Sequence, residues 1–210
     1  MMTRLICPMA LVAQALRSWP LLIALFAMPT QAAAPPDERA LHLVRGICAN
    51  CHGEDGNSRQ ALVPKLAGQH AAYLKRQVRD FMAGTRKHEL MTGFLSRLGD
   101  EDVDALGAYF SAQKPLAGAR GDPRIAERGK TLYFQGSRDT ALPSCDGCHS
   151  ADATGSPRFP RLAGQHPEYI VKQLKDIKTG QRVASPLMKA VADRISDDEM
   201  RALAVYLGGL

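Results

Sequence analysis

Aromatic side chains are scarce in this sequence, in which phenylalanine, tyrosine and tryptophan make up only 6% of 210 residues. The other proportions are ordinary for a folded protein, with 45% apolar and 23% charged residues. A chain of this length forms one large domain or two small ones. The shortage of aromatic rings raises the question of what else completes the core.

Acidic residues are missing from residues 1–34, which contain two arginines and the apolar run "PLLIALFAMP". A basic start, a short apolar stretch and small residues before a boundary are typical of a secretory signal peptide. We expect cleavage after Ala34 or Ala32, with an uncleaved membrane anchor as the alternative. An arginine and two prolines interrupt the segment, which favours a removable signal. No later segment approaches the ~20 apolar residues that span a bilayer.

A strong excess of either charge is also missing. The net charge is +6 and falls to +4 without the two arginines of the expected signal peptide. Neither half of the chain carries a basic stripe or an arginine-rich helix. We therefore expect no nucleic-acid binding.

Cysteine occurs only five times, and Cys7 lies in the expected signal peptide. The other four form two C-x-x-C-H motifs, "CANCH" and "CDGCH", which comprise Cys48, Cys51, His52, Cys145, Cys148 and His149. This motif is the attachment pattern of c-type haem. Both sulfurs of a motif form thioether bonds to the porphyrin, and the adjacent histidine supplies the proximal ligand to iron. The sequence therefore predicts two covalently attached haem c groups.

Three other uses of a C-x-x-C pair remain as alternatives. Disulfides form in the oxidising compartments that exported proteins reach. A zinc site does not require a histidine at the same place twice, and a thioredoxin-like motif is expected in a βαβ context that this sequence lacks. The histidine that follows both cysteine pairs favours haem.

The chain beyond the signal is an internal duplication. The two haem motifs are 97 residues apart, "PKLAGQHAAYLKRQ" precedes "PRLAGQHPEYIVKQ" by 96, and the segments that begin at Met91 and Met188 are again 97 apart. A segment rich in proline and glycine separates the copies. We expect a first domain over residues 35–114, a linker over 115–122 and a second domain over 123–210. A covalently held haem would complete the core of such small units.

Helical periodicity predicts an all-α fold with three main helices in each repeat. The first helix runs from near Asp37 into the haem motif, and its counterpart from Pro123 to about Phe134. The second covers about residues 70–83 and ends at Gly84, as its counterpart ends at Gly180. The third begins after Gly99 in one repeat and after Ser196 in the other.

A second axial ligand should occur at matching places in both repeats. Met91 and Met188 each lie 39 residues after the histidine of their haem motif, in segments that we expect to be loops. A methionine is by default a core filler, but the recurrence favours ligation. His/Met ligation raises the reduction potential of haem relative to a second imidazole.

The remaining repeated residues have milder interpretations. His70 and His166 also recur, and we expect them to be polar residues at helix starts rather than axial ligands. The carbonyls of Pro64 and Pro160 are candidates to accept the N–H of the proximal histidines, with a plain turn as the alternative. Tyr73 and Tyr169 either contact the haem or pack in the core. Four polar residues are expected at the surface: Gln69, Gln165, Arg79 and Lys175.

Taken together, "CANCHGEDGNS", "PKLAGQ", "YLKRQ" and "MTGFLS", with "CDGCHS", "FPRLAGQHPEYIVKQL" and "MKAVADRISDDEMRALAVYL", resemble the dihaem cytochrome c4 family. The resemblance covers nearly all of the chain beyond the signal. It implies two tandem class I cytochrome c domains, each a small helical domain around one haem, with His52 and Met91, and His149 and Met188, as iron ligands. It also implies haems that face each other across the domain interface.

The same resemblance implies a periplasmic electron carrier, soluble or loosely associated with the membrane, between a quinol-oxidising complex and a terminal oxidase. The sequence leaves open whether it is a monomer or a dimer. One alternative is the dihaem subunit of a dehydrogenase, such as a flavocytochrome c sulfide dehydrogenase. A second is a dihaem peroxidase, which the matching methionines argue against because one haem would need an open axial position.

Overall fold

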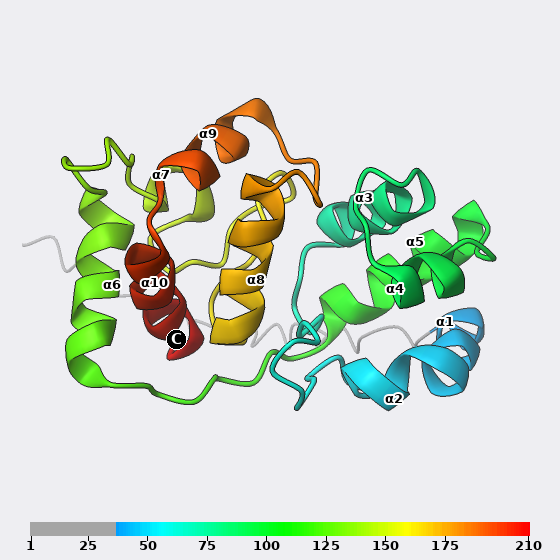
Figure 1. The fold of residues 1–210 in the computed structure, drawn as a ribbon. Helices are drawn as coiled ribbons and strands as arrows, with labels where there is room; N and C mark the ends of the chain where they lie inside the picture. Colours follow the sequence, from blue (N-terminus) through cyan, green and yellow to red (C-terminus); the bar gives the residue numbers. More distant parts are fainter. Residues whose placement is uncertain (1–36) are drawn as a thin grey trace, which may run out of the picture. The chain divides into compact units, whose positions relative to one another are not determined.

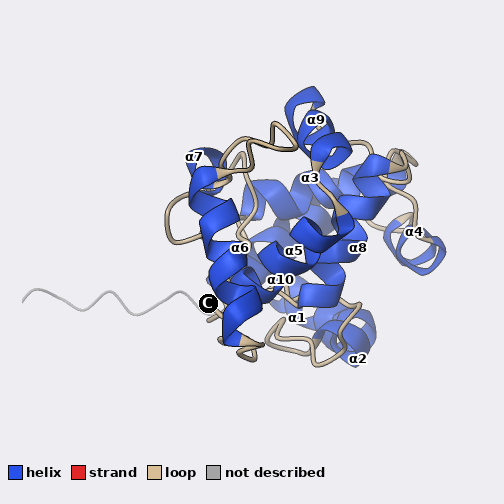
Figure 2. Ribbon diagram, turned by 60° about the vertical axis from the view of Figure 1, so that its left-hand side comes forward, coloured by secondary structure: helices blue, strands red, loops and turns tan. Residues whose placement is uncertain are grey.

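The computed structural model describes residues 37–210, so the expected signal peptide lies outside the described part of the chain. All regular elements in this range are helices (Figures 1 and 2). Backbone pairing of the β type in the same range consists of two isolated bridges, Arg86 with Arg182 and Ser137 with Leu142. The prediction of an all-α fold is confirmed.

Helices α1 to α5 make up what we call the first half. They are α1 Glu38–Leu43, the π-helix η1 Val44–Cys48, α2 Ala49–His52, α3 Ala71–Met82, α4 Glu89–Leu95 and α5 Asp100–Ala112. Helix α1 passes through η1 into α2 without a break, so one continuous helical segment carries the first haem motif, as predicted.

Helices α6 to α10 make up the second half. They are α6 Pro123–Gln135, α7 Asp146–His149, α8 Pro167–Lys178, α9 Pro186–Arg194 and α10 Asp197–Gly208. Here the first helix stops before the haem motif, and a loop over residues 136–145 lies between α6 and α7. Ser137 and Leu142 exchange two backbone hydrogen bonds in this loop, at 2.9 and 2.8 Å. The loop buries Leu142 in the core of the second half.

Local sequence signals determine where most helices begin. The Asp122 side chain accepts a hydrogen bond from the Arg124 N–H at 2.8 Å, and Pro123 occupies the first turn, where its missing N–H has no cost. The side chains of Ser196 and Glu199 each bond the other residue's backbone N–H, which forms the predicted capping box of α10.

The first half contains one short helix more than predicted, α4, and the second half contains two, α7 and α9. Met91 lies in α4 and Met188 in α9, so the prediction that both methionines lie in loops is wrong. The side chains of His88 and Ser185 accept hydrogen bonds from the N–H groups of these methionines, at 3.5 and 3.2 Å. Helices of seven and nine residues are too short for a periodicity argument.

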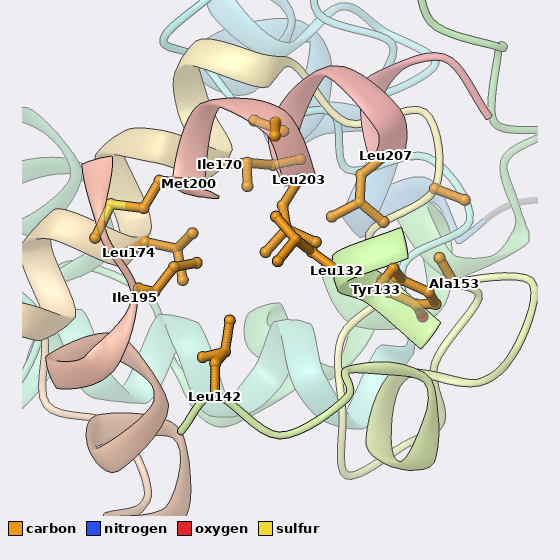
Figure 3. Packing of buried hydrophobic residues seen from close by; sticks show 13 residues of the cluster. Leu132, Tyr133, Leu142, Ala153, Ile170, Leu174, Ile195, Met200, Leu203 and Leu207 are labelled. Atoms are coloured by element: carbon orange, nitrogen blue, oxygen red, sulfur yellow. The ribbon is translucent and has the colours of Figure 1, made fainter. Parts of the chain in front are cut away.

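The core of the second half lies between α6, α8 and α10 and contains thirteen buried residues. In Figure 3, Leu174, Ile195 and Met200 lie together at one end of this cluster, and Tyr133 and Ala153 lie at the other. The corresponding cluster of the first half has only Val44, Leu106 and Phe110 fully buried. The connected core cluster of the first half is therefore smaller than that of the second half.

The crossing of α6 over α10 depends on Gly129. A Cβ atom at this position would lie 2.0 Å from the carbonyl oxygen of Ala202 and 2.8 Å from the Cβ of Tyr206. The contact is with backbone, which cannot move aside as a flexible side chain can. Glycine at this position therefore allows the two helices to approach closely.

We predict that Gly129→Ala lowers the free energy of unfolding by on the order of 2 kcal/mol, because overpacking outweighs the helix propensity gained from alanine. Guanidinium unfolding of the purified protein measures the change. Gly99→Ser is the matched control, since a Cβ there meets only a carboxylate oxygen of Asp102, at 3.7 Å. Equal midpoints for Gly129→Ala and the unaltered protein would contradict this packing.

Candidate haem-binding sites

The histidine of each haem motif is fixed by one hydrogen bond to a proline carbonyl. Nδ1 of His52 lies 2.9 Å from the carbonyl oxygen of Pro64, and Nδ1 of His149 lies 3.1 Å from that of Pro160. A carbonyl only accepts, so Nδ1 carries the proton and Nε2 keeps its lone pair for a metal. The predicted role of both prolines is therefore confirmed by these contacts.

Burial keeps both imidazoles neutral. It lowers the pKa of His52 and of His149, while the hydrogen bonds to the proline carbonyls act in the opposite direction without overcoming it. A neutral imidazole is the form that coordinates iron. The two histidines are thus held in the tautomer, charge state and orientation of a haem ligand.

None of the four cysteines of the motifs is paired in a disulfide. Cys145 packs against the same hydrophobic cluster as Met188, which brings one cysteine and the methionine of the second half together. In the first half, Cys48 packs against the cluster of Val44, and Met91 is half-buried in α4.

The segments that lead to the two methionines pair with each other. The N–H of Lys87 bonds to the carbonyl of Gln181 at 3.0 Å, and the N–H of Val183 to that of Thr85 at 2.8 Å. These bonds enclose the bridge between Arg86 and Arg182. The two methionine-bearing segments therefore hold each other in place, within one compact unit formed by both halves.

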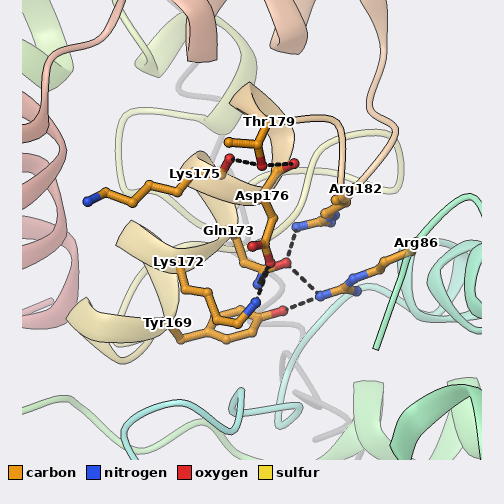
Figure 4. Close-up of polar contacts among 8 residues, drawn as sticks. All are labelled: Arg86, Tyr169, Lys172, Gln173, Lys175, Asp176, Thr179 and Arg182. Carbon is orange, nitrogen blue, oxygen red and sulfur yellow. Dashed lines mark hydrogen bonds and ion pairs between the residues drawn. The ribbon is translucent and has the colours of Figure 1, made fainter. Parts of the chain in front are cut away.

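Two buried glutamines support this pairing through the arginine side chains. Arg86 donates to Gln77, Gln173 and the Tyr169 hydroxyl, at 2.9, 2.8 and 2.6 Å. Arg182 makes the mirror-image contacts with Gln173, Gln77 and the Tyr73 hydroxyl, at 2.9, 2.6 and 2.5 Å. Figure 4 shows Arg86 and Arg182 converging on Gln173. Each tyrosine thus contacts the opposite half.

Sequence reasoning missed these arginines and glutamines, although the signal was present. Arg86 and Arg182 are 96 residues apart, as are Gln77 and Gln173, so all four recur at matching places in the repeats. Tyr73 shows why such residues matter. Burial raises its pKa, but Arg182 and Arg86 outweigh burial and the pKa is lowered.

Two predicted surface residues are buried instead. The side chains of Gln69 and Gln165 are only 6% and 8% exposed, so the expectation that they lie at the surface is wrong. Arg79 and Lys175 are exposed as expected and form ion pairs with Asp100 and Asp197. A glutamine carries no charge to keep it in water, so sequence alone does not separate the two environments.

Two further histidines, His70 and His166, occupy N-cap positions of helices and contact the opposite half. His70 is the N-cap of α3 and its Nε2 lies 2.9 Å from the carbonyl of Thr154. His166 is the N-cap of α8 and its Nε2 lies 2.9 Å from the carbonyl of Ser58. The interpretation of both as polar residues at helix starts is confirmed, since their Nε2 atoms have protein partners.

The residues around the two motifs fit a haem. Large apolar side chains lie exposed beside the histidine and methionine positions of the first half, namely Ile47, Leu90 and Phe94 at 40%, 66% and 49%. In the second half, Val183 and Leu187 lie exposed close in sequence to Met188, with exposed fractions of 61% and 58%. A flat macrocycle would cover such surface, which soluble proteins otherwise limit. In addition, Nε of Arg161 is buried without a partner among residues 37–210 and suits an anionic group such as a propionate.

No helix within residues 37–210 combines the length and the hydropathy of a bilayer-crossing segment.

Two family models match the chain in tandem. One, described as cytochrome c oxidase, cbb3-type, subunit III, matches residues 27–110, and the other, described as cytochrome c, matches residues 126–210. Each match contains one C-x-x-C-H motif. The chain therefore has two cytochrome c domains and binds two covalently attached haem c groups.

Similar proteins cover most of the chain. It is 41% identical to cytochrome c4 of Azotobacter vinelandii, over 78% of this chain and 84% of that protein. It is 36% identical to a thiosulfate dehydrogenase electron acceptor of Stutzerimonas stutzeri, over 78% of each. The crystal structure of reduced recombinant cytochrome c4 from Pseudomonas stutzeri matches with a TM-score of 0.77 and 38% identity, over 84% of this chain and all of that one.

The cytochrome c4 proteins among them are electron-transfer proteins rather than enzymes, and the solved structure shares the fold of this chain. The chain belongs to the cytochrome c4 family of dihaem electron-transfer proteins.

Proposed function

We propose that this protein carries electrons in the periplasm, from a quinol-oxidising complex to a terminal oxidase, through two haems with His/Met ligation. The cysteine pairs Cys48 with Cys51 and Cys145 with Cys148 attach the haems. The iron ligands are His52 with Met91 and His149 with Met188. The observation that carries this proposal is the same pair of features in each half: an imidazole whose Nε2 has no hydrogen-bond partner among residues 37–210, and a methionine at the matching position of a short helix.

The chain's own residues do three things in this mechanism. The carbonyls of Pro64 and Pro160 hold the Nδ1 protons, so that His52 and His149 keep one orientation in both redox states. Met91 and Met188 would hold the metal together with the histidines, and a metal held in this way would be closed to oxygen and peroxide. The haem iron supplies the one-electron chemistry, and ligands that stay in place keep reorganisation small.

A thioether ligand also adjusts the driving force. Methionine sulfur favours ferrous iron relative to a second imidazole and raises the reduction potential. A high potential suits a protein that accepts electrons from a quinol-oxidising complex. Burial of both proximal histidines acts in the same direction, because a low-dielectric environment disfavours the additional charge of ferric iron.

The domain limits belong to the proposal. We place the first haem domain at residues 35–114, the linker at 115–122 and the second haem domain at 123–210. Residues 1–34 act as the signal peptide that directs the chain to the periplasm. Cell fractionation and mass spectrometry test the cleavage. A cleaved signal leaves a shortened chain in the periplasmic fraction, whereas a retained anchor leaves the full-length chain in the membrane fraction.

A second candidate is a carrier that accepts electrons from a dehydrogenase. One relative bears the name thiosulfate dehydrogenase electron acceptor and is 36% identical to this chain. Stopped-flow reduction of the oxidised protein separates the candidates. Faster reduction by a quinol-oxidising complex than by a thiosulfate-oxidising dehydrogenase supports the first proposal, and the reverse order supports the second.

We predict that Met91→His and Met188→His each lower the potential of one haem by on the order of 0.1 V or more, within the ~0.8 V that axial ligands control. The potential of the other haem should change little. Spectroelectrochemical titration of the purified protein measures both. Met82→His is the matched control, because Met82 is exposed and has no methionine counterpart in the second repeat. Unchanged potentials in both variants would refute the ligand assignment.

We predict that replacing Cys48 and Cys51 together by alanine leaves one covalent haem per chain instead of two, because the second motif is intact. Replacing Cys145 and Cys148 should do the same. Mass spectrometry of the denatured protein counts the haems, so the result does not depend on folding of the altered half. Two haems in either variant would show that attachment occurs elsewhere.

A further inference from the structure

The side chains of Gln69 and Gln165 each bind backbone of the opposite half. The amide nitrogen of Gln165 donates to the carbonyl of Lys65 at 3.0 Å, and its oxygen accepts from the N–H of Lys65 at 2.9 Å. Gln69 makes the same pair of bonds with Arg161, at 3.0 and 2.9 Å. Each glutamine therefore pairs with one residue as a neighbouring β-strand would.

The residues held in this way are those that directly follow the two prolines. Lys65 follows Pro64, whose carbonyl accepts from His52, and Arg161 follows Pro160, whose carbonyl accepts from His149. The contacts thus run from Gln165 through Lys65 and Pro64 to the histidine of the first half. They run from Gln69 through Arg161 and Pro160 to the histidine of the second half.

The side chain of each glutamine is also held by a hydrogen bond within its own half. The oxygen of Gln69 also accepts the N–H of His70 at 3.1 Å, and the oxygen of Gln165 accepts the N–H of His166 at 3.1 Å. The side chains are only 6% and 8% exposed. A buried amide with all its partners in place has one orientation, and the loss of a partner carries the cost of an unsatisfied polar group.

The neighbouring histidines hold the same two loops at a second point. Nε2 of His166 contacts the carbonyl of Ser58, and Nε2 of His70 contacts that of Thr154, both at 2.9 Å. Each half therefore holds the segment around the proline of the other half at two places, one before the proline (Ser58 or Thr154) and one directly after it (Lys65 or Arg161). This arrangement determines where the proline carbonyl lies.

We propose that Gln165 is a positioning residue for the haem of the first half, and Gln69 for the haem of the second half. Each glutamine tunes the reduction potential of the haem that is bound by the other half. This inference rests on the proposed ligation by His52 and His149. The hydrogen bond to Nδ1–H raises the basicity of a ligating imidazole, which favours ferric iron and lowers the potential.

The sign of the effect follows from this chemistry. Release of Lys65 lets the Pro64 carbonyl move away from His52, and the weaker hydrogen bond makes the imidazole a poorer donor to iron. The potential of the first haem then rises. We expect about a threefold or larger change in its reduction equilibrium, where a tenfold change corresponds to about 59 mV for one electron.

The experiment compares Gln165→Leu with Gln69→Leu in the intact dihaem protein. Amide exchange of Lys65 and Arg161 reports the contacts, and NMR of the stepwise-reduced protein assigns each potential to its haem. Gln165→Leu should accelerate exchange at Lys65 and raise the potential of the first haem only. Gln69→Leu should accelerate exchange at Arg161 and raise that of the second haem only. If a leucine variant does not fold, the corresponding Gln→Met variant, which keeps the side-chain length, is used instead.

Tyr73→Phe is the control for a general loosening of the interface, because it removes a different bond between the halves, to Arg182. It should leave exchange at Lys65 and Arg161 unchanged. Unchanged amide exchange in the glutamine variants would contradict the contacts of Gln165 with Lys65 and of Gln69 with Arg161. Equal shifts of both potentials in one variant would contradict the claim that each glutamine acts only on the haem of the other half. Faster exchange without any shift overturns the positioning role. The proposed ligation is judged separately, by the methionine-to-histidine variants.

Discussion

The structure depends on a hydrogen bond from a buried imidazole to a proline carbonyl, made once in each half. A histidine held by one nitrogen in an apolar setting is neutral, has one tautomer and presents its other nitrogen in one direction. These are the conditions for a metal ligand that does not move when the metal changes its charge. The surrounding loops, caps and contacts between the halves keep the two carbonyl oxygens in place.

The two halves are not independent units joined by a linker. Side chains of α3 and of the turn before it contact loops of the second half, and the equivalent residues of α8 contact the first half. Small units gain rigidity from such contacts, because the connected core cluster of the first half contains only three buried residues. Duplication thus supplied both a second haem domain and the surface that steadies the first.

The polar character of this contact region has a consequence for haem binding. Arg86 and Arg182 place two positive charges there, both hydrogen-bonded to glutamine and tyrosine, and Arg86 also lies over the Phe81 ring, 4.5 Å from its centroid. The pKa of Tyr73 is lowered because the guanidinium groups outweigh its burial. Any anionic group of a haem that reaches this region meets a positive environment, which favours binding of the negatively charged cofactor over its loss.

The amino-acid sequence determined the haem chemistry of this protein, because attachment and proximal ligation are local. Two cysteines and a histidine within five residues define each site, and capping residues define the ends of helices such as α10. The repeat also pointed to Met91 and Met188, although not to the short helices that carry them, which packing and single caps stabilise. Only the tertiary structure decided that Gln69 and Gln165 are buried, since their partners lie 92 and 100 residues away. The repeat marks both glutamines as recurring residues but does not identify their partners, so the contacts emerge only when the two halves pack together.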